Sequence, residues 1–288
     1  MDLVPYPQIF NDVNNQKAEV ILYRPTGESG DFEKANFPIG VEGGKTSTCP
    51  TQNLMEAYDM KDGTPFVWNN QSNPYDNRDP RMKYTIVCNA MKWPVDPVEI
   101  WEGGTNGLPL QNATTTGYYL KKYVNNTISF EAGSTVTKKQ HNWVLFRYGE
   151  ILLNYAEAMI NAFHDPNYKD AVYNMSAREA VNQIRGRTNI SLPGFPSDIT
   201  EKDFVKRLKN ERRVELAFEG HRFWDVRRWK ELGQTANIYG VKITKNNEVI
   251  SYEKFLLETR AVTDNMYFYP IPNTERFKNP NLGQNPGW

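Results

Sequence analysis

The sequence has few of the residues that would identify a protein at once. It contains two cysteines and three histidines among 288 residues, and its 34 Lys and Arg balance its 34 Asp and Glu. A formal net charge of zero gives no general attraction to nucleic acid or to an anionic membrane surface. Cys49 and Cys88 cannot form a disulfide framework. They are either two buried thiols or one disulfide, which requires proximity in an oxidising compartment.

Several recognisable segments and motifs are also missing. No run of about 18 apolar residues occurs, and the start, MDLVPYPQIF, lacks the basic and apolar parts of a signal peptide. We therefore expect no membrane-spanning or secretory segment within these residues. His141, His164 and His221 are isolated, without the spacing that places two zinc ligands on one helical face. The sequence also has no GxSxG motif and no P-loop, so it predicts no metal site, no cofactor and no nucleophile.

Aromatic residues, in contrast, are abundant. They make up 13% of the chain, with 16 Tyr and 7 Trp, in an otherwise ordinary globular composition of 39% hydrophobic and 24% charged residues. Amphipathic rings commonly pack at the margin of a core, and this accounts for most of them. The remainder suggests that some rings face a ligand or a partner.

The organisation of the chain changes near residue 140. Residues 1–140 are rich in Asn, Gly, Pro and Thr, with short strand-like runs at residues 18–23 and 84–87. We predict a loop-rich region with minor β structure there. Residues 141–288 have a helical period and are predicted to form a helical-hairpin scaffold followed by a tail. The two parts together are expected to make one domain.

The helical period predicts a first hairpin after Trp143. One helix is expected to end near residues 164–166, because the residue before a proline avoids the helical conformation. A second helix is expected around residues 171–187, where small residues permit close antiparallel packing. The apolar stripe of the first helix comprises Phe146, Gly149, Leu153, Ala156 and Ile160.

A third helix has a clear start signal. Thr200 is the expected N-cap, with Asp203 three residues later, and the apolar stripe that follows is expected to stop at Gly220. Further helical turns are predicted from residue 221 to residue 233. Two successive helical hairpins indicate a mostly α, tetratricopeptide-like fold, although the repeat pattern is only partly present.

Residues 210–230, NERRVELAFEGHRFWDVRRWK, mix charges of both signs with aromatic rings. Glu215 and Glu219 have the spacing of a general acid and base on one helix. Opposite charges, however, recur three residues apart, as expected for a structural network of ion pairs beneath Trp224 and Trp229. We favour the network. The pairs predicted by this spacing are Arg212–Glu215, Arg222–Asp225 and Asp225–Arg228.

These helices and several further motifs resemble the carboxy-terminal half of the SusD/RagB family of nutrient-binding outer-membrane lipoproteins. The resemblance extends from about residue 19 to residue 287, and its motifs occur in the order of the family. They are PTQNL at 50–54, AYDMKDG at 57–63, NRDPR at 77–81, GYYLKKY at 117–123, FRYGEILLNYAEA at 146–158, PIP at 270–272, NPNL at 279–282 and QNPG at 284–287.

The resemblance implies a binding protein, not an enzyme. A member of this family is expected to capture an oligosaccharide at the cell surface of Bacteroidetes-type bacteria and to cover a TonB-dependent transporter of the SusC type. The lipid anchor and the first helical hairpins of the family are absent from this sequence, so outer-membrane attachment is expected only for a longer protein. Two alternatives remain, a peptide-capturing relative and a glycan-degrading enzyme with two separated carboxylates.

Sugar recognition requires a flat exposed ring for stacking and nearby amides for hydrogen bonds. The run Trp68-Asn69-Asn70-Gln71 supplies both within a polar loop, residues 64–77. Tyr75 is close in sequence, and Trp93 and Trp101 flank another loop rich in Pro and Gly. We predict ligand contact at Trp68, Asn69, Asn70, Tyr75, Trp93 and Trp101, with local packing as the alternative. Arg78, Arg81, Trp224 and Arg227 are assigned to the scaffold.

Overall fold

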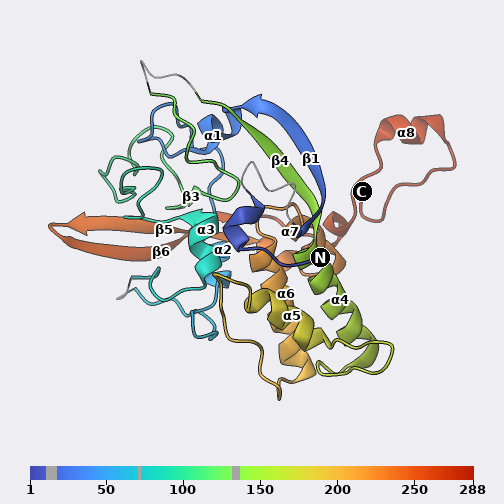
Figure 1. The fold of residues 1–288 in the computed structure, drawn as a ribbon. Coiled ribbons are helices and arrows are strands. Elements are labelled where there is room, and N and C mark those ends of the chain that lie inside the picture. The colour runs from blue at the N-terminus through green and yellow to red at the C-terminus, as the bar shows by residue number, and fades with distance from the viewer. Residues whose placement is uncertain (11–17, 71–72, 132–136) are drawn as a thin grey trace.

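The computed structural model describes residues 1–10, 18–70, 73–131 and 137–288. In these residues, the longer helices gather at the lower right of Figure 1, and loops with paired strands lie above them and to the left. The helices are α1 (Asp31–Asn36), α2 (Gln52–Ala57), α3 (Pro80–Thr85), α4 (Tyr148–Phe163), α5 (Ala177–Arg185), α6 (Glu201–Glu215), α7 (Arg222–Arg228) and α8 (Asn273–Lys278). The short 3-10 helices are η1 (Tyr6–Ile9), η3 (Leu232–Thr235) and η4 (Asp264–Tyr267).

The described strands form three separate antiparallel pairs. Strand β1 (Val20–Ser29) pairs with β4 (Lys139–Arg147), β2 (Ile86–Val87) with β3 (Tyr119–Leu120), and β5 (Asn237–Asn246) with β6 (Val249–Thr259). The expected strand at residues 18–23 is the beginning of β1. Of the expected strand at residues 84–87, only the last two residues are extended, because the first two complete α3.

Helix α4 forms as its apolar stripe predicts, with Leu153, Ala156 and Ile160 buried, and it ends at His164 in the left-handed conformation. The prediction for Phe146 is wrong. Phe146 belongs to β4, which runs directly into α4, and its ring is 47% exposed. Extension of β4 through Arg147 pairs it with β1 and delays the helix start.

Helix α5 packs beside α4, and α6 packs against α4 in turn (Figure 1). The prediction that α5 begins near residue 171 is wrong, because Ser176 and Glu179 form a capping box that fixes the start at Ala177. The predicted start of α6 is confirmed. The Thr200 side chain accepts a hydrogen bond from the backbone N–H of Asp203.

Helix α6 is shorter than predicted, and so is α7. Helix α6 ends at Glu215, and a turn then leads to Gly220, whose φ of +84° is accessible to glycine. Helix α7 has only two turns. The backbone at Lys230 is left-handed, which ends the predicted run to residue 233, and η3 follows.

Two hydrophobic clusters flank α6. On one side, Leu208 and Leu216 pack with α4 and α5. On the other, Val214 joins the cluster built around Tyr58 and Tyr118, which Val241 of β5 also enters. The sequence analysis did not anticipate the β5–β6 hairpin. Its turn at Asn247 and Glu248 and its buried Val241, Ile243 and Tyr252 place it against the loop-rich region.

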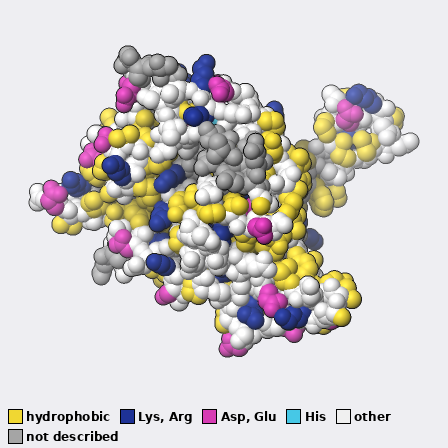
Figure 2. Space-filling model, viewed as in Figure 1, with side chains coloured by type: hydrophobic (Ala, Val, Ile, Leu, Met, Phe, Trp, Pro, Cys, Tyr) yellow, Lys and Arg dark blue, Asp and Glu magenta, His cyan; other side chains and the backbone are white. Residues whose placement is uncertain are grey.

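The chain after β6 forms an arm that extends from the body (Figure 1). The Trp288 indole N–H donates to the carbonyls of Asn265 and Phe268 and so joins the two ends of the arm, and the Tyr269 ring stacks on Phe223 of α7. Apolar side chains lie on its surface (Figure 2), among them Phe277 at 83% exposure.

Candidate functional site

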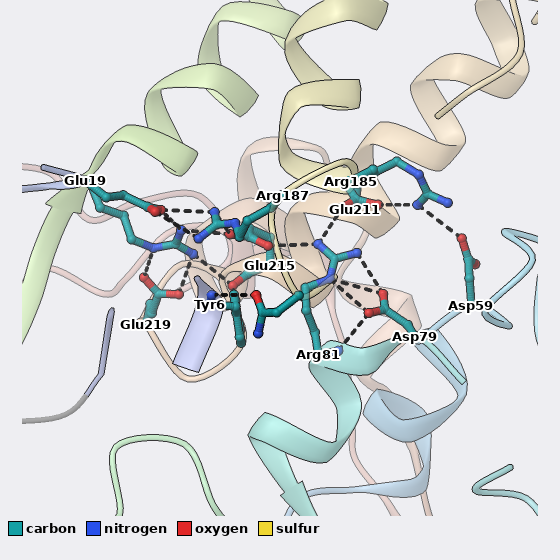
Figure 3. Close-up of polar contacts among 12 residues, drawn as sticks. Tyr6, Glu19, Asp59, Asp79, Arg81, Arg185, Arg187, Glu211, Glu215 and Glu219 are labelled. Atoms are coloured by element: carbon teal, nitrogen blue, oxygen red, sulfur yellow. Dashed lines mark hydrogen bonds and ion pairs between the residues drawn. The ribbon is translucent and has the colours of Figure 1, made fainter. Parts of the chain in front are cut away.

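A network of buried ion pairs links segments that lie far apart in the sequence (Figure 3). Glu215 of α6 lies at its middle, 0% exposed, and contacts three guanidinium groups, those of Arg81, Arg147 and Arg187, at 2.7–2.8 Å. Arg147 and Arg187 also bind Glu19 at 2.9 Å. Because these partners come from α3, β4 and the segments beside α5 and β1, the network joins distant parts of the chain.

A second carboxylate extends the network along α6. Glu211 accepts hydrogen bonds from Arg81 at 2.6 Å and from Arg185 at 2.7 Å, and Arg81 also binds Asp79. Asp59 forms the outer end, where its carboxylate lies 3.4 Å from Arg185 (Figure 3). The prediction of a structural ion-pair network is therefore confirmed.

The predicted pairs within α6 and α7 are mostly wrong. Arg212 binds Asp225 at 2.8 Å instead of Glu215, and Arg222 donates to Gln234 instead of Asp225. Only Asp225–Arg228 forms as predicted, at 2.9 Å. Glu215 points into the protein, toward cations that sequence spacing cannot identify. Trp224 is 59% exposed, and its ring packs against Phe223 and Tyr269 instead of the network.

Glu215 and Glu219 cannot act as an acid–base pair in this environment. Burial alone would raise the pKa of Glu215, but the three surrounding arginines hold it well below the usual range. Arg147 and Lys122 likewise lower the pKa of Glu219 against the effect of burial. Both carboxylates thus remain charged and engaged at neutral pH, which is typical of a structural site.

The predicted ligand-binding loop lies against the core cluster that contains Tyr58. The Trp68 ring is half-buried there and meets the Phe66 ring edge-on at 6.4 Å. Its indole N–H donates to the side chain of Asn70. Asn69 is exposed, and Gln71 lies outside the described residues. The structure therefore brings Trp68 and Asn70 together, but the indole N–H, the only hydrogen-bond donor of the ring, is engaged within the loop.

The other predicted rings occupy separate places around the same cluster. Tyr75 packs edge-on against Tyr118 and Tyr252, and burial holds its pKa well above the usual range. Trp93 is only 4% exposed and packs against Phe37, although it lines a surface hollow of about 970 Å³ with residues 94–99 and 126–131. The half-buried Trp101 ring lies 4.8 Å from the Lys245 ammonium.

The sequence analysis missed a cleft of about 460 Å³ beside the Trp68 loop. It is lined by α6, by the C-terminal end of α2 and by Pro65 and Phe66 of that loop. Parts of α7 and η3 complete the lining. We call it the α6 cleft. A sequence signal for it exists, because Lys202, Lys206, Lys209 and Arg213 recur at helical spacing on α6, opposite the buried stripe.

Both cysteines are free thiols. Cys88 is buried, which raises its pKa to about 12, and Cys49 is half-buried. In the described ranges, no group of three or more His, Cys, Asp or Glu side chains is placed to hold a metal ion. The helices of these ranges include none with the length and apolarity to span a bilayer.

Solved structures share this fold. A SusD-like protein of Bacteroides fragilis NCTC 9343 aligns with 98% of the chain at a TM-score of 0.77 and 26% identity. A SusD-like carbohydrate-binding protein of the same organism aligns with 97% at a TM-score of 0.78 and 24% identity. The chain covers 57% of each of those proteins.

Sequence comparison gives the same relationship. SusD-like protein P2 of Formosa agariphila is 29% identical over 163 residues, which is 54% of this chain and 28% of that protein. The chain thus spans only part of the length of its relatives. Residues 9–288 match the SusD family, nearly the whole sequence. On this match, together with the common architecture, the chain belongs to the SusD family.

Proposed function

We propose that this chain binds oligosaccharides at the cell surface and delivers them to a TonB-dependent outer-membrane transporter of the SusC type. The family match over residues 9–288 carries the proposal. The full-length protein is then held at the outer membrane by a lipid anchor on a segment outside these residues. A carbohydrate-binding relative of the same fold supports a glycan as the ligand.

We place the first sugar contact at the loop that carries Trp68. An aromatic face and neighbouring amides from Asn69 and Asn70 match the apolar face and hydroxyl rim of a pyranose. Packing of Trp68 on the core holds the ring in place, which lowers the entropy lost on binding. Tyr75, Trp93 and Trp101 remain proposed contacts. Among them, Trp93 lines the surface hollow of about 970 Å³.

We further propose that the protein does not degrade its ligand. The paired carboxylates that sequence spacing suggested, Glu215 and Glu219, are committed to arginine and lysine partners in the interior. Neither can reach a glycosidic bond without dismantling the network. Binding without turnover is the function that this arrangement supports.

Isothermal titration against a panel of oligosaccharides tests the proposal. Trp68→Ala should weaken binding by roughly 5–150-fold, the equivalent of 1–3 kcal/mol, by analogy with base stacking on aromatic rings. Trp224→Ala is the matched control, since Trp224 is an exposed indole on α7 assigned to the scaffold. It should leave affinity unchanged.

Two results would contradict the proposal. Binding of peptides but no oligosaccharide would favour a peptide-capturing member of the family. Unchanged affinity in Trp68→Ala, with a lower melting temperature, would make the ring a local core residue and move the site toward Trp93 and Trp101.

A further inference from the structure

The α6 cleft carries an excess of positive charge. Six cationic side chains line it, together with three carboxylates. The cations are Lys202, Lys206, Arg207, Lys209, Arg213 and Arg222, and the carboxylates are Glu56, Asp59 and Glu231. A cleft of one dominant sign attracts ligands of the opposite sign.

All three carboxylates already have cationic partners. Glu231 binds Lys209 at 2.5 Å, and Glu56 binds Lys254, which lies outside the cleft lining, at 2.8 Å. Asp59 lies 3.4 Å from Arg185 of the buried network and 3.8 Å from Arg207. The carboxylates therefore do not neutralise the four other cations of the cleft, which are Lys202, Lys206, Arg213 and Arg222.

Arg213 and Arg222 are the two cations best placed to hold an anion. Each makes a hydrogen bond to a neutral oxygen, Arg213 to the Asn53 carbonyl at 2.7 Å and Arg222 to Gln234 at 2.8 Å. Within the part of the chain that the structure describes, no carboxylate lies within 4.0 Å of either guanidinium. Burial, and then the charge of Arg222, lower the pKa of Arg213 to about 10, and Tyr58 and Glu56 oppose this only in part.

Helix geometry concentrates the rest of the charge along the same wall. Lys202, Lys206 and Lys209 precede Arg213 at intervals of one helical turn, so all four face one side of α6. Like charges at this spacing repel one another. An anion in the cleft would relieve this repulsion.

One wall of the cleft is aromatic. The Phe66 ring lines it, with the Arg78 guanidinium 3.7 Å from the ring centroid and the Trp68 ring packed against it at 76°. A ring next to guanidinium groups suits a ligand with both an apolar face and an acid group. The cleft also adjoins the loop that we propose as the first sugar contact.

We propose that the α6 cleft binds the acid group of an anionic oligosaccharide, with Arg213 and Arg222 holding the oxyanion and Phe66 facing the sugar. The planar guanidinium matches a carboxylate or a sulfate ester through paired hydrogen bonds. The inference rests on the proposed glycan-binding function and specifies the ligand class.

Isothermal titration of the whole chain with three hexasaccharides tests it. The probes are an oligogalacturonide, its fully methyl-esterified form, which keeps the backbone and removes the charge, and an O-sulfated neutral oligosaccharide. The oligogalacturonide or the sulfated probe should bind at least about tenfold more tightly than the methyl ester. Which of the two binds identifies the acid group.

The variants assign this preference to the cleft. Arg213→Gln and Arg222→Gln should each weaken binding of the charged probe about tenfold or more, with little effect on the neutral one. Arg213→Lys keeps the charge and should retain part of the affinity, which separates recognition from folding. Arg260→Gln is the matched control, because Arg260 is exposed outside the cleft and pairs with Glu258.

Each outcome is decisive. If the neutral probe binds equally well, or if the preference persists in Arg213→Gln, the inference fails while the glycan-binding function stands. If neither these probes nor the oligosaccharide panel binds, thermal melts in inorganic sulfate and in chloride at equal ionic strength separate the anion site from the glycan-binding function. Stabilisation by sulfate that Arg213→Gln removes would keep the anion site and refute the glycan function. Without such stabilisation, both fail.

Discussion

Replacing Glu215 by glutamine removes one charge from the buried network and keeps the shape of the side chain. Glu215 is fully buried and holds Arg81, Arg147 and Arg187 at 2.7–2.8 Å. Arg147 keeps Glu19 and Glu219, and Arg187 keeps Glu19, so no guanidinium loses every partner. The interior nevertheless loses the one negative charge that contacts all three of these guanidinium groups. We expect a loss of about 3–5 kcal/mol, as for breaking a buried pair.

Urea unfolding followed by circular dichroism measures this loss. The slope with denaturant should stay the same, so that the shift in midpoint reports stability alone. Glu201→Gln is the matched control, because Glu201 pairs with His164 on the surface and should change stability by no more than about 0.5 kcal/mol. A change in Glu215→Gln as small as that of the control would refute the reasoning.

Three further predictions concern stability and activity. Because their cationic partners hold the pKa values of Glu211, Glu215 and Glu219 below the ordinary glutamate value of 4.5, the stability that these groups contribute should be fully present above about pH 4.5. It should fall as acid titrates them, and a melting temperature constant down to pH 2 would contradict this. Asp225→Ala should cost about 3–5 kcal/mol, because it removes the carboxylate 2.8 Å from the buried Arg212 and leaves only Glu150, 4.0 Å away, with ligand affinity unchanged in titrations. The purified chain should release no reducing sugar from any polysaccharide that it binds. Turnover that a single carboxylate substitution abolishes would refute binding without degradation.

Local signals in the sequence were enough to place the principal helices. The Thr200 side chain caps α6 as predicted, and the apolar stripe of α4 identifies its buried face. Such features depend on residues within one or two turns of each other, so the sequence carries them directly. The family motifs supplied the relationship that residue chemistry alone did not.

Long-range contacts could not be predicted in the same way. Glu215 has its partners at positions 81, 147 and 187, and no spacing rule on α6 indicates them. The candidate site has the same difficulty, because whether Trp68 packs or stands free depends on the cluster beneath its loop. The β5–β6 hairpin was missed although its Asn247 turn gave a local signal.

The network described around Glu215 also has a consequence for how the chain folds. Its charged groups come from residues near positions 19, 81, 147, 187 and 215, so most of its ion pairs close only after long loops have formed. An intermediate that lacks any one segment leaves buried charges with fewer partners than they have in the folded protein, which is costly. Partly assembled states are therefore disfavoured, and folding should be slow. A fragment that omits the first 20 residues loses Glu19 and should not fold independently.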